Sequence, residues 1–439
     1  MNIKKFIDLA SDFTFNKRKL IYEFGIVAWG SIFSIAFTFI GIKIISSKLG
    51  AESYGEISLY LTITMLVHLV FSGPFSGAIA RFSSIAIHDR RFFKFESELI
   101  KFFIDTLKIA LFLFIVAAVC LFNKSIQDYA LLVIYSLLYS ISYFVFTQVL
   151  AILGALRERF WVSFINILEK LFRFGLAYIT IIFYNSNVKM VFLSFGVGLL
   201  LISITSCLIY YKLVREKIKK DTGTPEISLY KHELINYSLP FALFGIIIWL
   251  QNSSEKWFLD LFVGTKEVGI YSILNQVGFQ TFVLLSGVIT SMSTPIIFEK
   301  SSSISKKTAI RLNTLVTFFF IVIGIITIIL SCYFGDDLII IFSSSEFISK
   351  PYLLPIITIS GVLFAIAQNI SINYMILLKS KLLQYPKIIS GIVGVFINYI
   401  LTKSYGLDGL TFSILITNFL YLLILVIVQS YYLQEEIGD

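Results

Sequence analysis

Long runs of apolar residues, separated by short polar segments, recur along the whole chain. A run of about 20 apolar residues can cross the hydrocarbon core of a bilayer as an α-helix. The alternating runs of about ten residues that a transmembrane barrel would need do not occur in the sequence. The pattern therefore predicts an all-α polytopic membrane protein with about twelve spanning helices. Their predicted ranges are 20–46, 54–80, 99–122, 128–153, 160–184, 188–211, 237–262, 267–296, 311–332, 353–378, 387–402 and 407–432.

The composition supports this interpretation. Of the 439 residues, 57% are hydrophobic and 14% are charged. A soluble protein is roughly 25% charged, so this chain has too few charges to cover soluble domains. We attribute the net charge of +9 to basic loops beside a membrane, and we expect no nucleic-acid partner.

Lysine and arginine are distributed unevenly between the predicted loops. If the N-terminus is cytoplasmic, the cytoplasmic segments hold 24 of the 36 Lys and Arg residues and the outer loops hold six. Cytoplasmic loops of membrane proteins carry such an excess. We therefore expect both termini and the segment 212–236 to be cytoplasmic, and we expect no cleavable signal peptide because the start lacks a cleavage site.

The two halves of the chain resemble each other at an offset of 214–215 residues. Gly30 corresponds to Gly245, and the turn 50–58 corresponds to the turn 264–272, each with glycines five residues apart. Six helices in each half predict a parallel repeat about an axis along the membrane normal. The expected domains are a cytoplasmic segment 1–19, an N-lobe 20–211, a cytoplasmic linker 212–236, a C-lobe 237–432 and a cytoplasmic tail 433–439.

Several ionisable residues fall inside the predicted helices, where they are costly and usually functional. Three pairs of opposite charge have helical spacing, namely Glu169 with Arg173, Asp105 with Lys108, and Lys256 with Asp260. Such pairs serve either structure alone or function as well. Four more residues have no partner at helical spacing: Lys43, His68, Lys170 and Glu255.

Three positions near the helix ends or in mid-span have alternative interpretations. Lys43 either extends its ammonium towards the interface or faces a cavity. His68 is either a hydrogen-bonded core residue or part of a site. Arg81 is either an interface anchor or a residue at the cytoplasmic mouth of a transport path. Gly73-Pro74, just before Arg81, interrupts the second helix, as in a bent gating helix.

Four cations at predicted membrane depth favour a cavity for an anion, above all a phosphate group. They are Lys43, Lys170, Arg173 and Lys256. Amides on the later helices offer hydrogen bonds to sugars, although amides also hold helices together. These amides are Asn252, Asn275, Gln276, Gln280, Gln368, Asn369, Asn373 and Asn398.

We expect no enzymatic activity, no metal site and no bound cofactor. The sequence has no Walker A motif, and its histidines, His68, His88 and His232, are scattered. The three cysteines are widely spaced, and we interpret them as packing residues. No long outer loop is present that could hold the catalytic groups of a polysaccharide polymerase or a glycosyltransferase.

Four motifs together carry a family resemblance. They are the turn Leu49-Gly-Ala-Glu-Ser-Tyr-Gly55, the helix start Tyr237-Ser-Leu-Pro240, the stretch from Glu255-Lys256 to Gly264, and Val268-Gly-Ile-Tyr271-Ser. With the twelve predicted helices, the chain resembles the bacterial polysaccharide or O-antigen flippases (Wzx-type) of the multidrug/oligosaccharidyl-lipid/polysaccharide exporter superfamily. That family commonly has Asp followed by a basic residue where this chain has Glu255-Lys256.

The resemblance implies a V-shaped, MATE-like transporter with two six-helix lobes in the bacterial inner membrane. Its cavity would be lined by the first, second, seventh and eighth helices. The implied cargo is a polyprenyl-diphosphate-linked oligosaccharide that crosses by alternating access, with coupling to H⁺ or Na⁺ as a further option. Membrane lipid, the polymerase and the chain-length regulator of the same pathway are the other candidate partners.

On this hypothesis the candidate residues fall into two groups. The substrate-binding candidates are Lys43, Lys170, Arg173, Lys256, Arg81 and His68. The candidates for ion coupling or charge pairing are Glu255, Asp260 and Glu169. The alternatives are an ion-coupled multidrug exporter of the same fold, which would carry acidic cation sites, and a scaffolding protein, which the charges at mid-depth disfavour.

Overall fold

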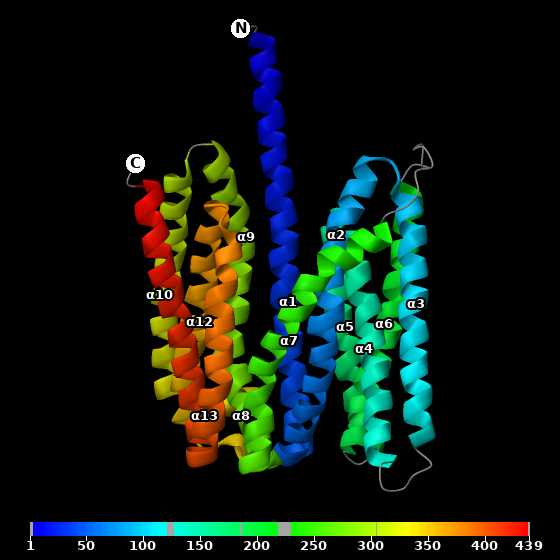
Figure 1. Cartoon of the computed structure of the whole chain (residues 1–439), viewed down its shortest axis with the longest axis vertical. Helices are drawn as coiled ribbons and strands as arrows, with labels where there is room; N and C mark the ends of the chain where they lie inside the picture. Colours follow the sequence, from blue (N-terminus) through cyan, green and yellow to red (C-terminus); the bar gives the residue numbers. More distant parts are fainter. Residues whose placement is uncertain (1–2, 121–126, 185–186, 218–229, 304, 438–439) are drawn as a thin grey trace. The chain divides into compact units, whose positions relative to one another are not determined.

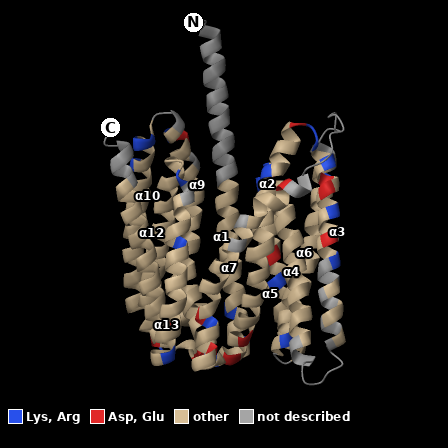
Figure 2. Ribbon diagram, in the orientation of Figure 1, with Lys and Arg blue, Asp and Glu red and all other residues tan. Residues whose placement is uncertain are grey.

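The computed structural model describes residues 3–120, 127–184, 187–217, 230–303 and 305–437. Within these ranges the chain is helical apart from short turns and contains no strand (Figure 1). The fold is all-α, as the sequence predicts. Many of the described charged residues lie towards the helix ends, and long uncharged stretches remain in several helices, as expected for helices that cross a bilayer (Figure 2).

Within the described residues, every predicted span falls on helix, and the end of the predicted span 99–122, at 121–122, lies outside them. The first half consists of α1 (Ile3–Val67), a π turn η1 (His68–Ser72), α2 (Gly73–His88), α3 (Phe92–Cys120), α4 (Gln127–Ala155), α5 (Arg159–Phe183) and α6 (Val188–Lys217). The second half consists of α7 (Tyr230–Phe262), α8 (Thr265–Leu274), a π turn η2 (Asn275–Gln280), α9 (Thr281–Ser303), α10 (Lys306–Tyr333), α11 (Gly335–Phe342), η3 (Ser345–Phe347), α12 (Leu353–Ile376), η4 (Ser380–Leu383) and α13 (Gln384–Ile437).

Two of the helices are double-length and bend at a glycine. In α1 the bend is at Gly50, whose φ of +78° is a left-handed value, and in α13 it is at Gly406, with φ +60°. The amide of Ala51, which begins the second part of α1, donates to Glu346 Oε1 at 2.9 Å. A carboxylate thus caps the new helical segment, and the loop after α11 holds the bend.

The second and eighth predicted spans are each interrupted by a π turn. Pro74 cannot donate an N–H to the preceding helical turn, and η1 lies directly before it. Gln148 of α4 donates to the carbonyl of Ser72 at 3.1 Å, which satisfies a backbone group at the break. The predicted interruption of the second helix is therefore present.

By length and hydropathy, seven described helices could cross a membrane, or eight if the bent α7 counts as one span. Two of the seven, 25–88 and 384–431, are 64 and 48 residues long, enough for two crossings each. Helix α5 is not among the seven because it carries Glu169, Lys170 and Arg173 at mid-length. The chain is a multi-pass membrane protein.

The chain divides into two compact units. The first comprises residues 1–41, 71–177 and 193–241, and the second comprises 42–70, 178–192 and 242–439. The second unit therefore includes the segments 42–70 and 178–192, which lie within the predicted N-lobe. The predicted lobe boundaries themselves stay a prediction, and residues 218–229 of the predicted linker 212–236 lie outside the described part of the chain.

In the second unit, α12 packs against α9, α10 and α13 (Figure 1). Buried amides join two of these helices: Asn313 of α10 donates to the Asn369 carbonyl at 2.9 Å and to Asn373 Oδ1 at 2.8 Å. Asn369 and Asn373, two of the predicted sugar-binding amides, are thus used as contacts between helices.

Candidate functional site

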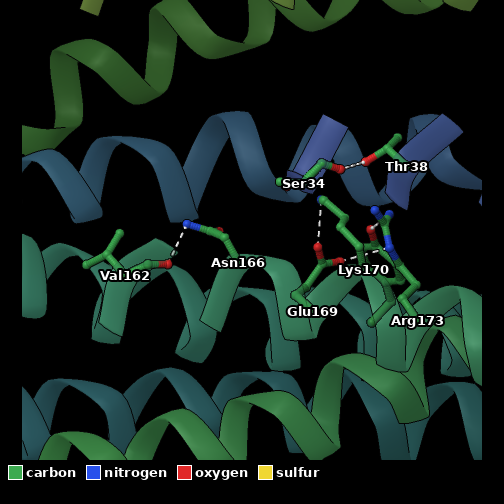
Figure 3. Close-up of polar contacts among 8 residues, drawn as sticks. Ser34, Thr38, Val162, Asn166, Glu169, Lys170 and Arg173 are labelled. Carbon is green, nitrogen blue, oxygen red and sulfur yellow. Dashed lines mark hydrogen bonds and ion pairs between the residues drawn. The ribbon is translucent and has the colours of Figure 1, made fainter. Parts of the chain in front are cut away.

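A buried ion cluster lies at the middle of α5 in the first unit. Glu169 is 2% exposed. Its Oε1 lies 2.8 Å from Arg173 Nε, and its Oε2 lies 2.6 Å from Lys170 Nζ (Figure 3). The expected Glu169–Arg173 pair is present. Lys170, which has no partner at helical spacing, pairs with the adjacent Glu169. The long, flexible lysine side chain reaches the second carboxylate oxygen although the two residues are adjacent.

Aromatic residues surround the guanidinium of this cluster. It lies 3.4 Å from the Tyr139 hydroxyl and 4.8 Å from the centre of the Phe174 ring. Cation–π contact and ion pairing both compensate for its burial. One carboxylate between two cations leaves one net positive charge, and the Lys170 side chain, 24% exposed, is the more accessible cation.

A second set of polar residues lies on α7 and α8 in the second unit. The Tyr271 hydroxyl donates to Glu255 Oε2, and Asn275 Nδ2 donates to the Tyr271 hydroxyl at 3.3 Å. Glu255 therefore has a partner that helical spacing did not reveal, since Tyr271 lies 16 residues further on, beyond the turn at Gly264. Tyr271 belongs to one of the motifs that carry the family resemblance, and this was the signal in the sequence that could have identified it.

The expected pair between Lys256 and Asp260 is not formed. Asp260 instead accepts a hydrogen bond of 2.6 Å from the hydroxyl of Thr265, at the start of α8. Lys256 makes no hydrogen bond or ion pair with another residue in the described part of the chain. It lines a cavity instead.

This cavity, which we call the lysine cavity, has a volume of about 280 Å³ and lies entirely within the second unit. It contains a second lysine, Lys387, which begins the predicted span 387–402 and lies in the first turn of α13. Lys387 Nζ lies 5.7 Å from the centre of the Phe244 ring, and it has no ion-pair partner among the described residues. The lining residues are Met65, Ile248, Gln251, Asn252, Glu255, Lys256, Tyr271, Asn275, Phe279, Gln280, Val283, Phe364, Lys387, Asn398, Ile414, Thr417 and Asn418.

Six amide side chains line the lysine cavity, and three of them make no hydrogen bond to another described residue. Asn398 accepts a hydrogen bond from Ser413, and Asn418 donates to the carbonyl of Ile414 at 3.0 Å. The side-chain amides of Gln251, Asn252 and Gln280 make no hydrogen bond to another described residue. These amides can offer both donors and acceptors to a polar ligand.

Besides Asp260 and the three residues of the α5 cluster, three more predicted site residues lie outside the lysine cavity. Lys43 donates to the carbonyl of Ile340 in α11, so its ammonium neither extends freely nor lines the cavity. The guanidinium of Arg81 lies 5.2 Å from the centre of the Tyr237 ring. His68 is the first residue of η1 and does not line the cavity. Of the four predicted cavity cations, Lys256 alone lines it.

The described residues contain no group of three or more His, Cys, Asp or Glu side chains close enough to hold a metal ion. The ion-binding potential of the second unit thus rests on single groups, of which Glu255 is the acidic one inside the lysine cavity.

Comparison with known proteins identifies the family. The sequence model of the family described as "Polysaccharide biosynthesis protein" matches residues 23–301. The chain belongs to this family. No curated protein matches it by sequence.

Solved structures share the fold of this chain. An outward-facing multidrug resistance MATE family transporter of the MOP superfamily superposes with a TM-score of 0.64 at 12% identity, over 95% of this chain and 96% of that one. A MOP superfamily transporter from Pyrococcus furiosus, described as having a binding pocket of reverse polarity, gives 0.64 at 14% identity over 94% and 95%. A Vibrio cholerae MATE transporter gives 0.64 at 14% identity over 95% and 97%. The fold is therefore that of the MATE/MOP transporters.

Proposed function

We propose that this protein is a flippase that moves polyprenyl-diphosphate-linked oligosaccharide repeat units from the cytoplasmic to the outer face of the bacterial inner membrane. The units would serve O-antigen, capsule or exopolysaccharide assembly, and they would cross by alternating access. The family supports a role in polysaccharide biosynthesis, and the fold is one used by transporters.

The observation that carries the proposal is the lining of the lysine cavity. Neither Lys256 nor Lys387 forms an ion pair with another described residue, and amides whose side chains make no hydrogen bond lie in the same wall. Two ammonium groups attract a diphosphate, while amides bind sugar hydroxyls. Lysine is suited to a cargo that must leave again, because it acts as a mobile point charge rather than a bidentate clamp.

Glu255 is the candidate for coupling to H⁺ or Na⁺. Its carboxylate lies in the cavity wall beside the two lysines and is held by Tyr271. A carboxylate in this position can change its proton or its partner as the cavity changes access. In an ion-coupled multidrug exporter, the same carboxylate would bind cationic drugs. The Glu255→Gln variant described below tests this alternative function.

The first prediction concerns Lys256. In cells that lack the native protein, Lys256→Ala should abolish surface glycan while the protein still reaches the membrane, and Lys256→Arg should keep part of the activity. Lipid-linked repeat units should accumulate on the cytoplasmic face. The matched control is Lys266→Ala, the same change at an exposed position of α8 outside the cavity, which should leave surface glycan unchanged.

Two results would contradict the flippase proposal. One is normal surface glycan in the double variant Lys256→Ala, Lys387→Ala. The other is loss of drug efflux without any change in lipid-linked glycan when Glu255→Gln is introduced, which would favour the multidrug exporter instead.

A further inference from the structure

A second, larger cavity adjoins the lysine cavity within the second unit. Its volume is about 720 Å³, within the range of roughly 300–1,000 Å³ that is typical of ligand pockets. Val283 of α9 and Phe364 of α12 line both cavities, so the two share a wall. The remaining lining residues are Ser286, Gly287, Thr290, Ser291, Thr294, Phe298, Ala365 and Gln368. We call this space the hydroxyl cavity.

One face of α9 provides most of the hydroxyl cavity. Its residues recur every three or four positions from 283 to 298, which places them along one side of a helix. The hydroxyls of Ser286, Ser291 and Thr294 donate to carbonyls of their own helix, at 2.9, 2.7 and 2.7 Å. Their oxygen atoms remain free to accept hydrogen bonds from a ligand.

The hydroxyl cavity contains no ionisable lining residue. Its polar groups are the hydroxyls of α9 and the amide of Gln368, and its larger apolar part comes from Val283, Phe298, Phe364 and Ala365. A diphosphate would find no counter-charge there and would lose hydration without compensation. A neutral sugar ring fits better, since its hydroxyls can donate to the hydroxyl oxygens and its apolar C–H faces can pack on the phenyl rings.

We infer that the hydroxyl cavity is the compartment for uncharged sugar residues of the cargo, beside a lysine cavity that holds the charged diphosphate. This assignment rests on the proposed flippase function and adds the position of the glycan. A polyprenyl tail is the competing occupant of this largely apolar lining, and the sugar-free lipid probe described below distinguishes it from the glycan.

Gly287 allows the compartment to be filled without disturbing the helix. A Cβ added there would meet no atom within 4 Å, and Gly287 lines the cavity. Gly287→Leu therefore places a bulky side chain in the cavity. Gly175→Leu is the matched control, because Gly175 is also helical, also has open space at its Cβ, and lines neither cavity.

The test measures binding by the full-length protein in lipid nanodiscs, with two probes. One is a polyprenyl diphosphate without sugar, and the other is the same lipid carrying a neutral N-acetylhexosamine disaccharide. Gly287→Leu should weaken binding of the glycosylated probe about tenfold, equivalent to about 1.4 kcal/mol, and should leave the sugar-free probe within about twofold. Gly175→Leu should change neither.

A second variant keeps the test decisive if Gly287→Leu does not fold. Thr290→Val with Thr294→Val removes two hydroxyls at nearly constant volume, and it should weaken the glycosylated probe alone. If both variants bind the two probes like the native protein, or weaken both probes equally, the sugar compartment is refuted. The proposed function fails separately, if Lys256→Ala with Lys387→Ala leaves binding of both probes unchanged.

Discussion

At the residue scale, Glu169 occupies the most constrained electrostatic position described in the first unit. It is almost fully buried and holds two cations at 2.8 and 2.6 Å. Removing one partner of a buried ion pair strands a charge at low dielectric, which typically costs about 3–5 kcal/mol. The exposed pair Asp105–Lys108, at 3.3 Å, should be worth well under about 1 kcal/mol.

We therefore predict that Glu169→Gln destabilises the protein strongly, and that Glu169→Gln with Arg173→Gln is less damaging than Glu169→Gln alone. The double variant leaves only Lys170, whose partly exposed side chain can move away from the cluster. Thermal unfolding in detergent measures both, with Asp105→Asn as the mild control. A double variant as unstable as the sum of the two single variants would argue against pairing.

The same residues show what sequence alone could give. The Glu169–Arg173 pair could be predicted because a spacing of four residues places two side chains on one helix face. The contact from Lys170 to Glu169 depends on a side-chain rotamer, and the contact from Tyr271 to Glu255 depends on how α8 packs against α7. Neither follows from spacing, so the sequence overestimated the number of free cations.

At the scale of elements, two glycines from the repeated turns meet at a helix crossing in the second unit. A Cβ on Gly55 would lie 2.0 Å from the carbonyl oxygen of Thr265, and a Cβ on Gly269 would lie 1.8 Å from that of Ala51. Each glycine faces the carbonyl four residues before the other. The offset of 214 residues seen in the sequence thus corresponds to a symmetric contact between α1 and α8.

This crossing predicts that Gly55→Ala is destabilising. The added methyl would meet backbone rather than a flexible side chain, and overpacking of this kind typically costs about 1–3 kcal/mol. Gly77→Ala is the control, because its Cβ would meet nothing within 4 Å and alanine favours the helix by up to about 1 kcal/mol. Thermal unfolding compares the two. Equal stability of both variants would show that the crossing is loose.

The length of the apolar stretches explains why the helices could be predicted from the sequence, whereas the bends and π turns within them were harder to predict. An apolar stretch of about 20 residues specifies a span whatever its details. The bends at Gly50 and Gly406 keep neighbouring residues helical, so α1 and α13 each continue through two predicted spans. The π turn η2 has no proline to mark it and could not be read from the hydrophobic pattern.

At the scale of the whole molecule, the distribution of Lys and Arg predicts the orientation of the chain in its membrane. The positive-inside rule places the turn at Gly50 and the turn at Gly406 outside, and the turns between α2 and α3 and between α9 and α10 inside. A cysteine-free background is needed, because the native Cys332 is exposed. Single cysteines can then replace Glu52 and Ser404 on the expected outer side, and Asp89 and Lys307 on the expected inner side, all at exposed positions. Cysteines at the first two positions should react with an impermeant maleimide in intact cells, and those at the other two only after permeabilisation.

The reverse pattern would invert the orientation and with it the direction of transport proposed for the cargo, while the helices and both cavities would stand. The two members of a pair could also differ, one reacting in intact cells and the other only after permeabilisation. That result would contradict the span count, because the turns at Gly50 and Gly406 share a side only if an even number of crossings separates them.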